Sequence, residues 1–263
     1  MISNHEIDYQ IHGEEMQYVE VELDPNETAV AESGAFMMMD DGIQMQTIFG
    51  DGSKPQQGIL GKLMSAGKRV LTGESLFMTA FTNTSVSKRK VSFASPYPGK
   101  IIAIDLLRMG GKMICQKDSF LCAAKGVSIG IEFQRKLGTG LFGGEGFIMQ
   151  KLEGDGLAFV HAGGHVTERE LQAGELLKID TGCIVAFTQT VNYDIQFVGG
   201  IKNSIFGGEG LFFATLRGPG KVWIQTLPIS RLAGRILAYG TYKRKEEGSI
   251  LGGIGNLLDG DGR

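Results

Sequence analysis

The feature of this sequence that most constrains its fold is a short motif that occurs three times. Gly73–Met78 has the sequence GESLFM, Gly144–Met149 has GEGFIM, and Gly208–Phe213 has GEGLFF. In each copy a glycine, a glutamate and a small residue precede three apolar residues. An internal repeat fixes the architecture of a chain, so the segments around these copies bear on the fold first.

The segments on either side of the motif also recur in the same order. Before each copy lies a segment with a leucine, a turn and an apolar strand pattern, and the three versions begin at Val19, Ile102 and Val166. After each copy lie two strand-like runs. In the second and third copies these runs are joined by Asp155-Gly156 and by Gly218-Pro219-Gly220, which are typical of tight turns. The order predicts three related β-units.

Alternating apolar and polar residues support strands between these segments. The odd-numbered positions of residues 127–133 and of residues 193–197 are all apolar or aromatic. Ile43 and Met45 alternate in the same way. A period of two is typical of half-buried strands. The predicted fold class is therefore all-β, with three tandem β-units related by pseudo-threefold symmetry.

The repeats also predict how the chain is divided. We expect one β domain over residues 1–242 and a C-terminal tail over residues 243–263. Within the domain, the units are predicted at about 15–100, 101–165 and 166–242. In the tail, residues 250–258 carry an apolar stripe with helical spacing, which we expect to dock on the core, a neighbouring copy or a membrane surface.

Composition excludes several classes of protein. The chain has 263 residues, of which 40 are glycine and 6 proline, and a formal net charge of −3. That charge argues against a general nucleic-acid binder, which needs a basic surface. Three cysteines without a CxxC pair favour buried thiols in a reducing compartment. With no signal-peptide pattern and no apolar stretch long enough to span a bilayer, we expect a cytoplasmic protein, with peripheral attachment to a membrane as the alternative.

The repeated turns, together with GESLFMTAF and PGKIIAIDL, resemble the altered-inheritance-of-mitochondria family (mitochondrial biogenesis, protein 24), whose bacterial members have no known function. The resemblance covers about residues 10–242. It implies a fold like that of the tryptophan RNA-binding attenuation protein, and it implies self-association. It implies no reaction and no catalytic residues. The tryptophan site and the RNA-contacting lysines of the attenuation protein have no counterpart in this sequence.

The repeated motif supplies the best candidate for a ligand site or a symmetry-axis loop. The spacing of Gly138, Gly140 and Gly143 fits GxGxxG, but a strand pattern follows instead of the helix that a phosphate site needs. A turn required in three places explains the glycines better. The glutamates of three converging loops would bind a cation, or each would accept N–H bonds from its own turn. The candidate residues are Gly73, Glu74, Gly144, Glu145, Gly208 and Glu209.

Other polar clusters offer less. His161 and His165 have the spacing of a zinc motif, but Gly163-Gly164 between them argues against the helix that this motif needs. Lys88-Arg89-Lys90 is either a solvated turn or a contact for an anionic partner. No GxSxG nucleophile motif is present. We predict no catalytic residues, no metal and no cofactor.

The function expected from the sequence is a non-enzymatic structural or interaction module that self-associates, with a trimer favoured. One alternative is a small-molecule- or metal-binding β-barrel protein or enzyme, whose ligand the sequence does not identify. A second is a peripheral membrane module that inserts the apolar residues Leu60, Leu63, Phe142 and Phe206 from glycine-rich loops. The mitochondrial inner-membrane role of the family's yeast relative favours this second alternative.

Overall fold

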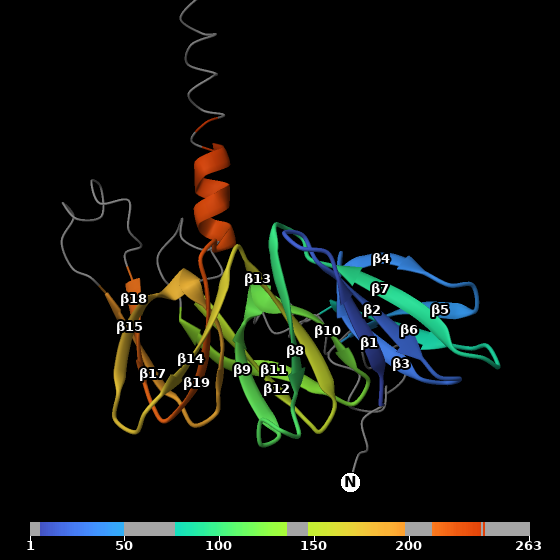
Figure 1. The fold of residues 1–263 in the computed structure, drawn as a ribbon, viewed down its shortest axis with the longest axis horizontal. Coiled ribbons are helices and arrows are strands. Elements are labelled where there is room, and N and C mark those ends of the chain that lie inside the picture. The colour runs from blue at the N-terminus through green and yellow to red at the C-terminus, as the bar shows by residue number, and fades with distance from the viewer. Residues whose placement is uncertain (1–5, 50–76, 136–146, 198–211, 238, 240–263) are drawn as a thin grey trace, which may run out of the picture. The chain divides into compact units, whose positions relative to one another are not determined.

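The computed structural model divides the chain into two compact units (Figure 1). The first unit ends at Leu227 and the second begins at Pro228. Both are described below only through the residues whose structure is defined, which are 6–49, 77–135, 147–197, 212–237 and 239. Within these residues, no helix is both long and apolar enough to cross a membrane.

The first unit consists of antiparallel strands arranged in four sheets, which confirms the all-β fold class for the described residues. The first sheet has the strand order β1-β2-β7-β4. Its strands are β1 (Asp8–His12), β2 (Tyr18–Leu23), β7 (Arg89–Ala94) and β4 (Phe36–Met39). Side chains along β2 alternate between fully buried and partly exposed, as expected for a strand with one face on the core.

The second and third sheets have six strands each. The second has the order β5-β6-β3-β10-β13-β8 and the third has the order β11-β12-β9-β16-β19-β14. The strands of the second are β5 (Ile43–Phe49), β6 (Phe77–Asn83), β3 (Thr28–Glu32), β10 (Phe120–Ala124), β13 (Leu157–Gly163) and β8 (Gly99–Asp105). Those of the third are β11 (Ser128–Arg135), β12 (Phe147–Glu153), β9 (Lys112–Gln116), β16 (Ile184–Thr188), β19 (Gly220–Gln225) and β14 (Val166–Leu171).

The fourth sheet has the order β15-β18-β17. Its strands are β15 (Leu176–Asp180), β18 (Phe212–Arg217) and β17 (Asn192–Phe197). Two short 3₁₀ helices, η1 (Lys117–Ser119) and η3 (Thr181–Cys183), directly precede β10 and β16.

The same pairings recur along the chain. In the first stretch, β2 and β4 both pair with β7, while β3 and β5 both pair with β6. The next six strands pair as β8 and β10 with β13, and β9 and β11 with β12. The last six pair as β14 and β16 with β19, and β15 and β17 with β18.

Two further pairings join these groups of strands. β3 pairs with β10, and β9 pairs with β16, both antiparallel. We call these two contacts the internal joints. Each joint fuses a three-stranded sheet of one group with a three-stranded sheet of the next, and this fusion produces the two six-stranded sheets.

A β-bulge also recurs. The register shifts immediately after the first paired residue of β4, β10 and β16, where Phe36 opposes Phe93, Phe120 opposes Val160 and Ile184 opposes Ile224. A bulge leaves one residue unpaired and bends the strand. Each of these three strands is therefore bent at the same point relative to its partner strand.

The buried apolar side chains form three clusters. One is centred on Phe81 and Phe93, a second on Phe120 and Trp223, and a third on Phe187. Burial of such large side chains is worth about 1.5–3 kcal/mol each, which makes these clusters the main source of stability. Cys115 and Cys122 are fully buried, as the sequence predicts, whereas Cys183 is only partly buried.

The predicted hairpin turns are present. Gly154-Asp155-Gly156 joins β12 to β13, and Gly218-Pro219 joins β18 to β19. Gly220 has a φ of +144°, a conformation that L side chains rarely adopt. The predicted alternation is also confirmed around Ile195, which is buried between exposed neighbours. On β5, Ile43 is buried as predicted, whereas Met45 is 45% exposed.

The second unit contains a helix over residues 229–237, which the repeat pattern does not predict. Pro228 precedes it, and the Arg231 and Leu232 amides both donate to the Pro228 carbonyl, at 3.0 and 3.2 Å. Proline suits the start of a helix because its φ is already helical and it has no N–H to satisfy. This proline was the available signal for a helix beginning here.

Candidate interaction surface

Most of the site proposed from the sequence falls outside the described residues. This holds for all six residues of the Gly-Glu motif, Gly73, Glu74, Gly144, Glu145, Gly208 and Glu209. It also holds for the apolar loop residues of the membrane alternative and for the tail over residues 243–263. These predictions stay untested.

The two histidines of the HAGGH segment lie in different surroundings. His161, on β13, is 1% exposed, and its ring contacts the edge of Tyr97 with 4.8 Å between centroids. Burial lowers the pKa of His161 to about 4, so this imidazole is neutral at physiological pH. His165 follows the strand and is exposed. Among the described residues, no three His, Cys, Asp or Glu side chains are grouped to hold a metal.

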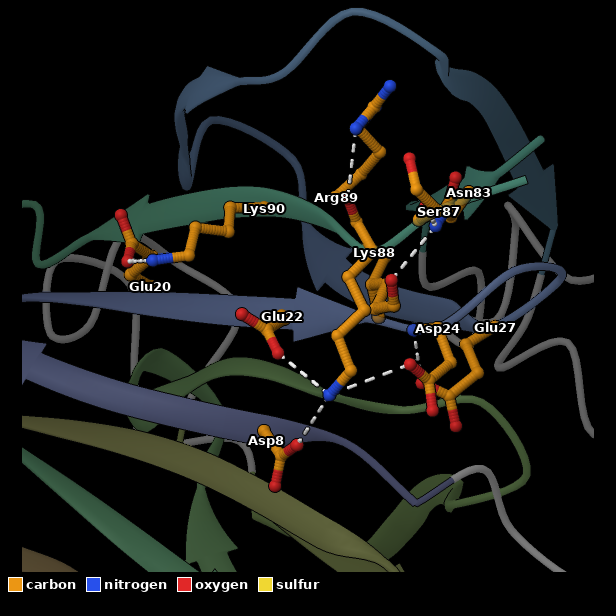
Figure 2. A network of polar contacts seen from close by, with 11 residues as sticks. Asp8, Glu20, Glu22, Asp24, Glu27, Asn83, Ser87, Lys88, Arg89 and Lys90 are labelled. Atoms are coloured by element: carbon orange, nitrogen blue, oxygen red, sulfur yellow. Dashed lines mark hydrogen bonds and ion pairs between the residues drawn. The ribbon is translucent and has the colours of Figure 1, made fainter. Parts of the chain in front are cut away.

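The basic segment at residues 88–90 is surrounded by carboxylates (Figure 2). Lys88 Nζ lies 2.8 Å from Glu22, 3.3 Å from Asp8 and 3.6 Å from Asp24. Lys90 Nζ lies 2.7 Å from Glu20. The hydrogen bond to Glu22, followed by that to Asp8, raises the pKa of Lys88 above its usual value.

These contacts join strands instead of leaving a charged surface for a ligand. Glu20 and Glu22 are on β2, and Asp8 is on β1, so the lysines connect three neighbouring strands. Arg89 Nε donates to the Asp41 carbonyl at 2.9 Å. Because its lysines are already paired with carboxylates, this segment has little attraction for an anionic partner. It corresponds to the solvated turn, one of the two interpretations offered by the sequence.

The first internal joint contains a carboxyl group in an unusual setting. Glu32 is the last residue of β3 and is half-buried. Burial, reinforced by the nearby Asp118, raises its pKa from 4.5 to about 7, although Lys117 acts in the opposite direction. At the second joint the last residue of β9 is the neutral Gln116. Burial also raises the pKa of the neighbouring Cys115 thiol to about 12, which makes it unreactive.

A large exposed apolar surface lies on β4. All four of its residues are exposed: Phe36 is 39%, Met37 49%, Met38 43% and Met39 38% accessible. Within the described residues β4 pairs only with β7, so its other edge is open. Phe36 is anchored by stacking on Phe81, with 5.5 Å between ring centroids.

β15 is the second open strand with apolar side chains. It pairs only with β18 among the described strands, and Leu176 is 50% exposed. Ile179 packs partly on the third apolar cluster. Lys178 does not extend away from the sheet, because its Nζ lies 5.4 Å from the centre of the Phe213 ring. The open edge of β15 is therefore accessible to another strand.

Sequence reasoning missed this surface. The run Phe36–Met39 is apolar at every position, which is typical of a strand buried on both faces. The flanking Gly34 and Asp40-Asp41 mark the ends of a short strand but carry no information about exposure. Methionine was the useful signal, since flexible thioether side chains are frequent at surfaces that bind other proteins.

The described strands thus form a paired β fold in which β4 presents an open apolar edge. The chain belongs to the family described as Mitochondrial biogenesis AIM24, whose model matches residues 9–227, and this match confirms the resemblance found in the sequence. It is 31% identical over 225 residues to an uncharacterised protein of Streptococcus pyogenes serotype M6, covering 84% of this chain and 86% of that one. The crystal structure of another Streptococcus pyogenes protein is similar, with a TM-score of 0.69, 25% identity, and coverage of 89% of this chain and 99% of that one.

Proposed function

We propose that this protein is a non-enzymatic structural or interaction module that associates with further copies of itself. The observation that carries the proposal is β4, on which four consecutive large apolar residues are exposed beside an open strand edge. An exposed edge of this kind is a template for pairing with another strand, and natural proteins usually block it with charges, proline or a covering segment. β4 itself contains no such residue.

We further propose that the described strands form three equivalent β-units, each made of six strands and similar to the tryptophan RNA-binding attenuation protein. The recurring pairings support this scheme. So does the bulge after the first residue of β4, β10 and β16. A fold assembled from units that each contact only their neighbours has two end units, and such ends need either caps or partners.

Sedimentation velocity over a dilution series tests the proposal. The monomer mass is 28.4 kDa. We expect a larger, concentration-dependent species at micromolar protein, with a trimer favoured among the closed assemblies. A single 28.4 kDa species at every concentration would contradict self-association.

A further inference from the structure

We propose that β15 of one copy pairs antiparallel with β4 of the next copy, which forms between chains the joint that β3–β10 and β9–β16 form within the chain. This inference rests on the proposed self-association and specifies the surface, direction and register of the contact. The occupant of each open edge is thus a second copy of the same chain.

The pairing scheme identifies these two edges as matching halves of a joint. β3, β9 and β15 are the second strands of the three proposed units, and each pairs with its own β6, β12 or β18. β4, β10 and β16 are the third strands. A joint connects the second strand of one unit to the third strand of the next. The two strands left over are β15 and β4.

Exposure agrees with this assignment. Every residue of β10 is buried, and four of the five residues in each of β3, β9 and β16 are buried. All of these strands belong to internal joints. In contrast, β15 has no buried residue and every residue of β4 is exposed. The same places in the scheme are therefore buried where a neighbouring unit is present and exposed where none is described.

The remaining edge strands give no reason to expect a further partner strand, because their equivalents have none in a neighbouring unit either. β5, β11 and β17 occupy the same place in the scheme, and each of them pairs with one described strand only. β8 and β14 are likewise both outer strands. Their counterpart β2 is covered by β1, which pairs with it antiparallel from Asp8 to His12. Among the described strands, only β4 and β15 lack a partner that their counterparts have in a neighbouring unit.

The open edges of β15 and β4 cannot pair with each other within one chain. β15 and β4 lie at opposite ends of the first unit (Figure 1), so the contact must join different copies. Such a head-to-tail contact uses two different surfaces and generates a closed ring, or a filament if the rotation does not close. A second copy is the one partner certain to carry both halves.

The internal joints also predict the register. Ala31 opposes Cys122 at the first joint, and Cys115 opposes Ala186 at the second. Counting from the bulge, Met38 takes the place of Cys122 and Ala186. Counting from the pairing with β18, Ile179 takes the place of Ala31 and Cys115, because all three are the next-to-last paired residue at the same end of their second strand. The expected opposed pairs are Ile179 with Met38, Lys178 with Met39, and Leu177 with Asp40.

Disulfide formation between two single variants tests this register. Opposed residues of an antiparallel pair have Cα atoms about 4.5–5.5 Å apart, within the range that a disulfide requires. Ile179→Cys and Met38→Cys are made in separate chains, both with Cys183→Ala, mixed, and oxidised. We expect a covalent dimer that contains one chain of each kind. Lys178→Cys mixed with Met38→Cys is the matched control, because its side chain points to the other face of the strand.

A charged variant separates this inference from the proposed function. Met38→Lys should weaken self-association at least tenfold, because it places an ammonium at the contact, while Met45→Lys on β5 serves as a control of equal exposure and should have no effect. Thermal melting of both variants checks that the fold is intact. A cross-link between Ile179→Cys and Met38→Cys chains, together with weakened association of Met38→Lys, supports the strand pairing. If Met38→Lys still forms oligomers and the Ile179→Cys and Met38→Cys chains do not cross-link, this pairing is overturned but self-association stands, whereas a wild-type monomer would overturn both.

Discussion

β10 and β4 are built alike, yet their side chains differ in exposure. Both pair with a neighbouring strand through a bulge after the first residue, and both are short apolar segments. β10 is completely buried because β3 covers its other edge, whereas β4 is exposed along its length. The comparison teaches that burial of such a strand goes with a second paired neighbour. The open edge of β4 then lacks a contact that β10 has, and the experiments below compare these two strands.

The largest effect is expected from placing a charge in an internal joint. Ala123, fully buried on β10, opposes Val30, and Ala123→Asp should cost more than about 4 kcal/mol of unfolding free energy, because a carboxylate would be buried without a partner. Met39 follows the bulge of β4 in the same way. Met39→Asp should change the stability of the monomer by less than about 1 kcal/mol and should dissociate the oligomer. Urea unfolding and sedimentation measure the two outcomes.

Removing an aromatic ring from β10 and from β4 sharpens the comparison between these two strands. Phe120→Ala leaves a cavity beneath β10 and should cost about 3–5 kcal/mol. Phe36→Ala, in the matching place on β4, removes a ring that is 39% exposed and should cost about 1–2 kcal/mol, mainly from lost contact with Phe81. Equal costs measured by chemical denaturation would show that β4 is already covered in the monomer.

The two internal joints should differ in their response to pH. The pKa of Glu32 is raised from 4.5 to about 7, so the folded state keeps a proton that the unfolded state has lost between these values. Its contribution to stability is fully present below pH 4.5 and is lost as the pH rises through about 7. Glu32→Gln places at the first joint the neutral side chain that Gln116 provides at the second. This variant should remove the pH-dependent loss of unfolding free energy, which is up to roughly 3 kcal/mol.

The unfolding free energy of the Glu32→Gln variant is compared with that of the wild-type protein at the same pH values. His161, with its pKa lowered to about 4, gives the opposite slope between that value and 6.5 in both proteins, so it cancels in the difference. The difference should be near zero at pH 4 and grow toward pH 7.5. A constant difference would mean that Glu32 is not shifted in the folded state.

The smallest effect is expected at the lysine contacts of Figure 2. Lys88 is 52% exposed, and ion pairs between exposed groups contribute little to stability. Lys88→Met should therefore destabilise the protein only slightly, with the difference reduced further in high salt. It should not change self-association, because β1 and β2 lie away from the open edge of β4. A change in oligomer mass with this variant would place the contact at the other edge of this sheet, on β1 instead of β4.

The sequence predicts the elements of this fold better than their environment. The turns at Asp155-Gly156 and Gly218-Pro219 and the alternation around Ile195 depend on local backbone preferences, and these predictions are confirmed. The exposure of Phe36–Met39 depends on which strand lies alongside, which is a property of the tertiary arrangement. The Gly-Glu motifs, the best candidate site in the sequence, lie outside the described residues and remain predictions.

The surroundings of the polar candidates were also beyond local patterns. The carboxylates around Lys88 come from residues 64 to 80 positions away in the chain, and only the pairing of β1, β2 and β7 brings them together. His161 is buried because β13 lies between β10 and β8. A sequence shows that such residues exist, but long-range strand order decides whether they are neutralised, buried or exposed.

Backbone hydrogen exchange, compared between oligomer and dilute monomer, tests the central claim most directly. A strand that gains a partner gains amide protection, since its exposed N–H groups become hydrogen-bonded. We expect protection to rise in residues 36–40 and 176–180 on association, while β5 and β14 stay unchanged as outer strands. Unchanged exchange in β4 and β15, or protection that appears in β5 or β14 instead, would contradict the account.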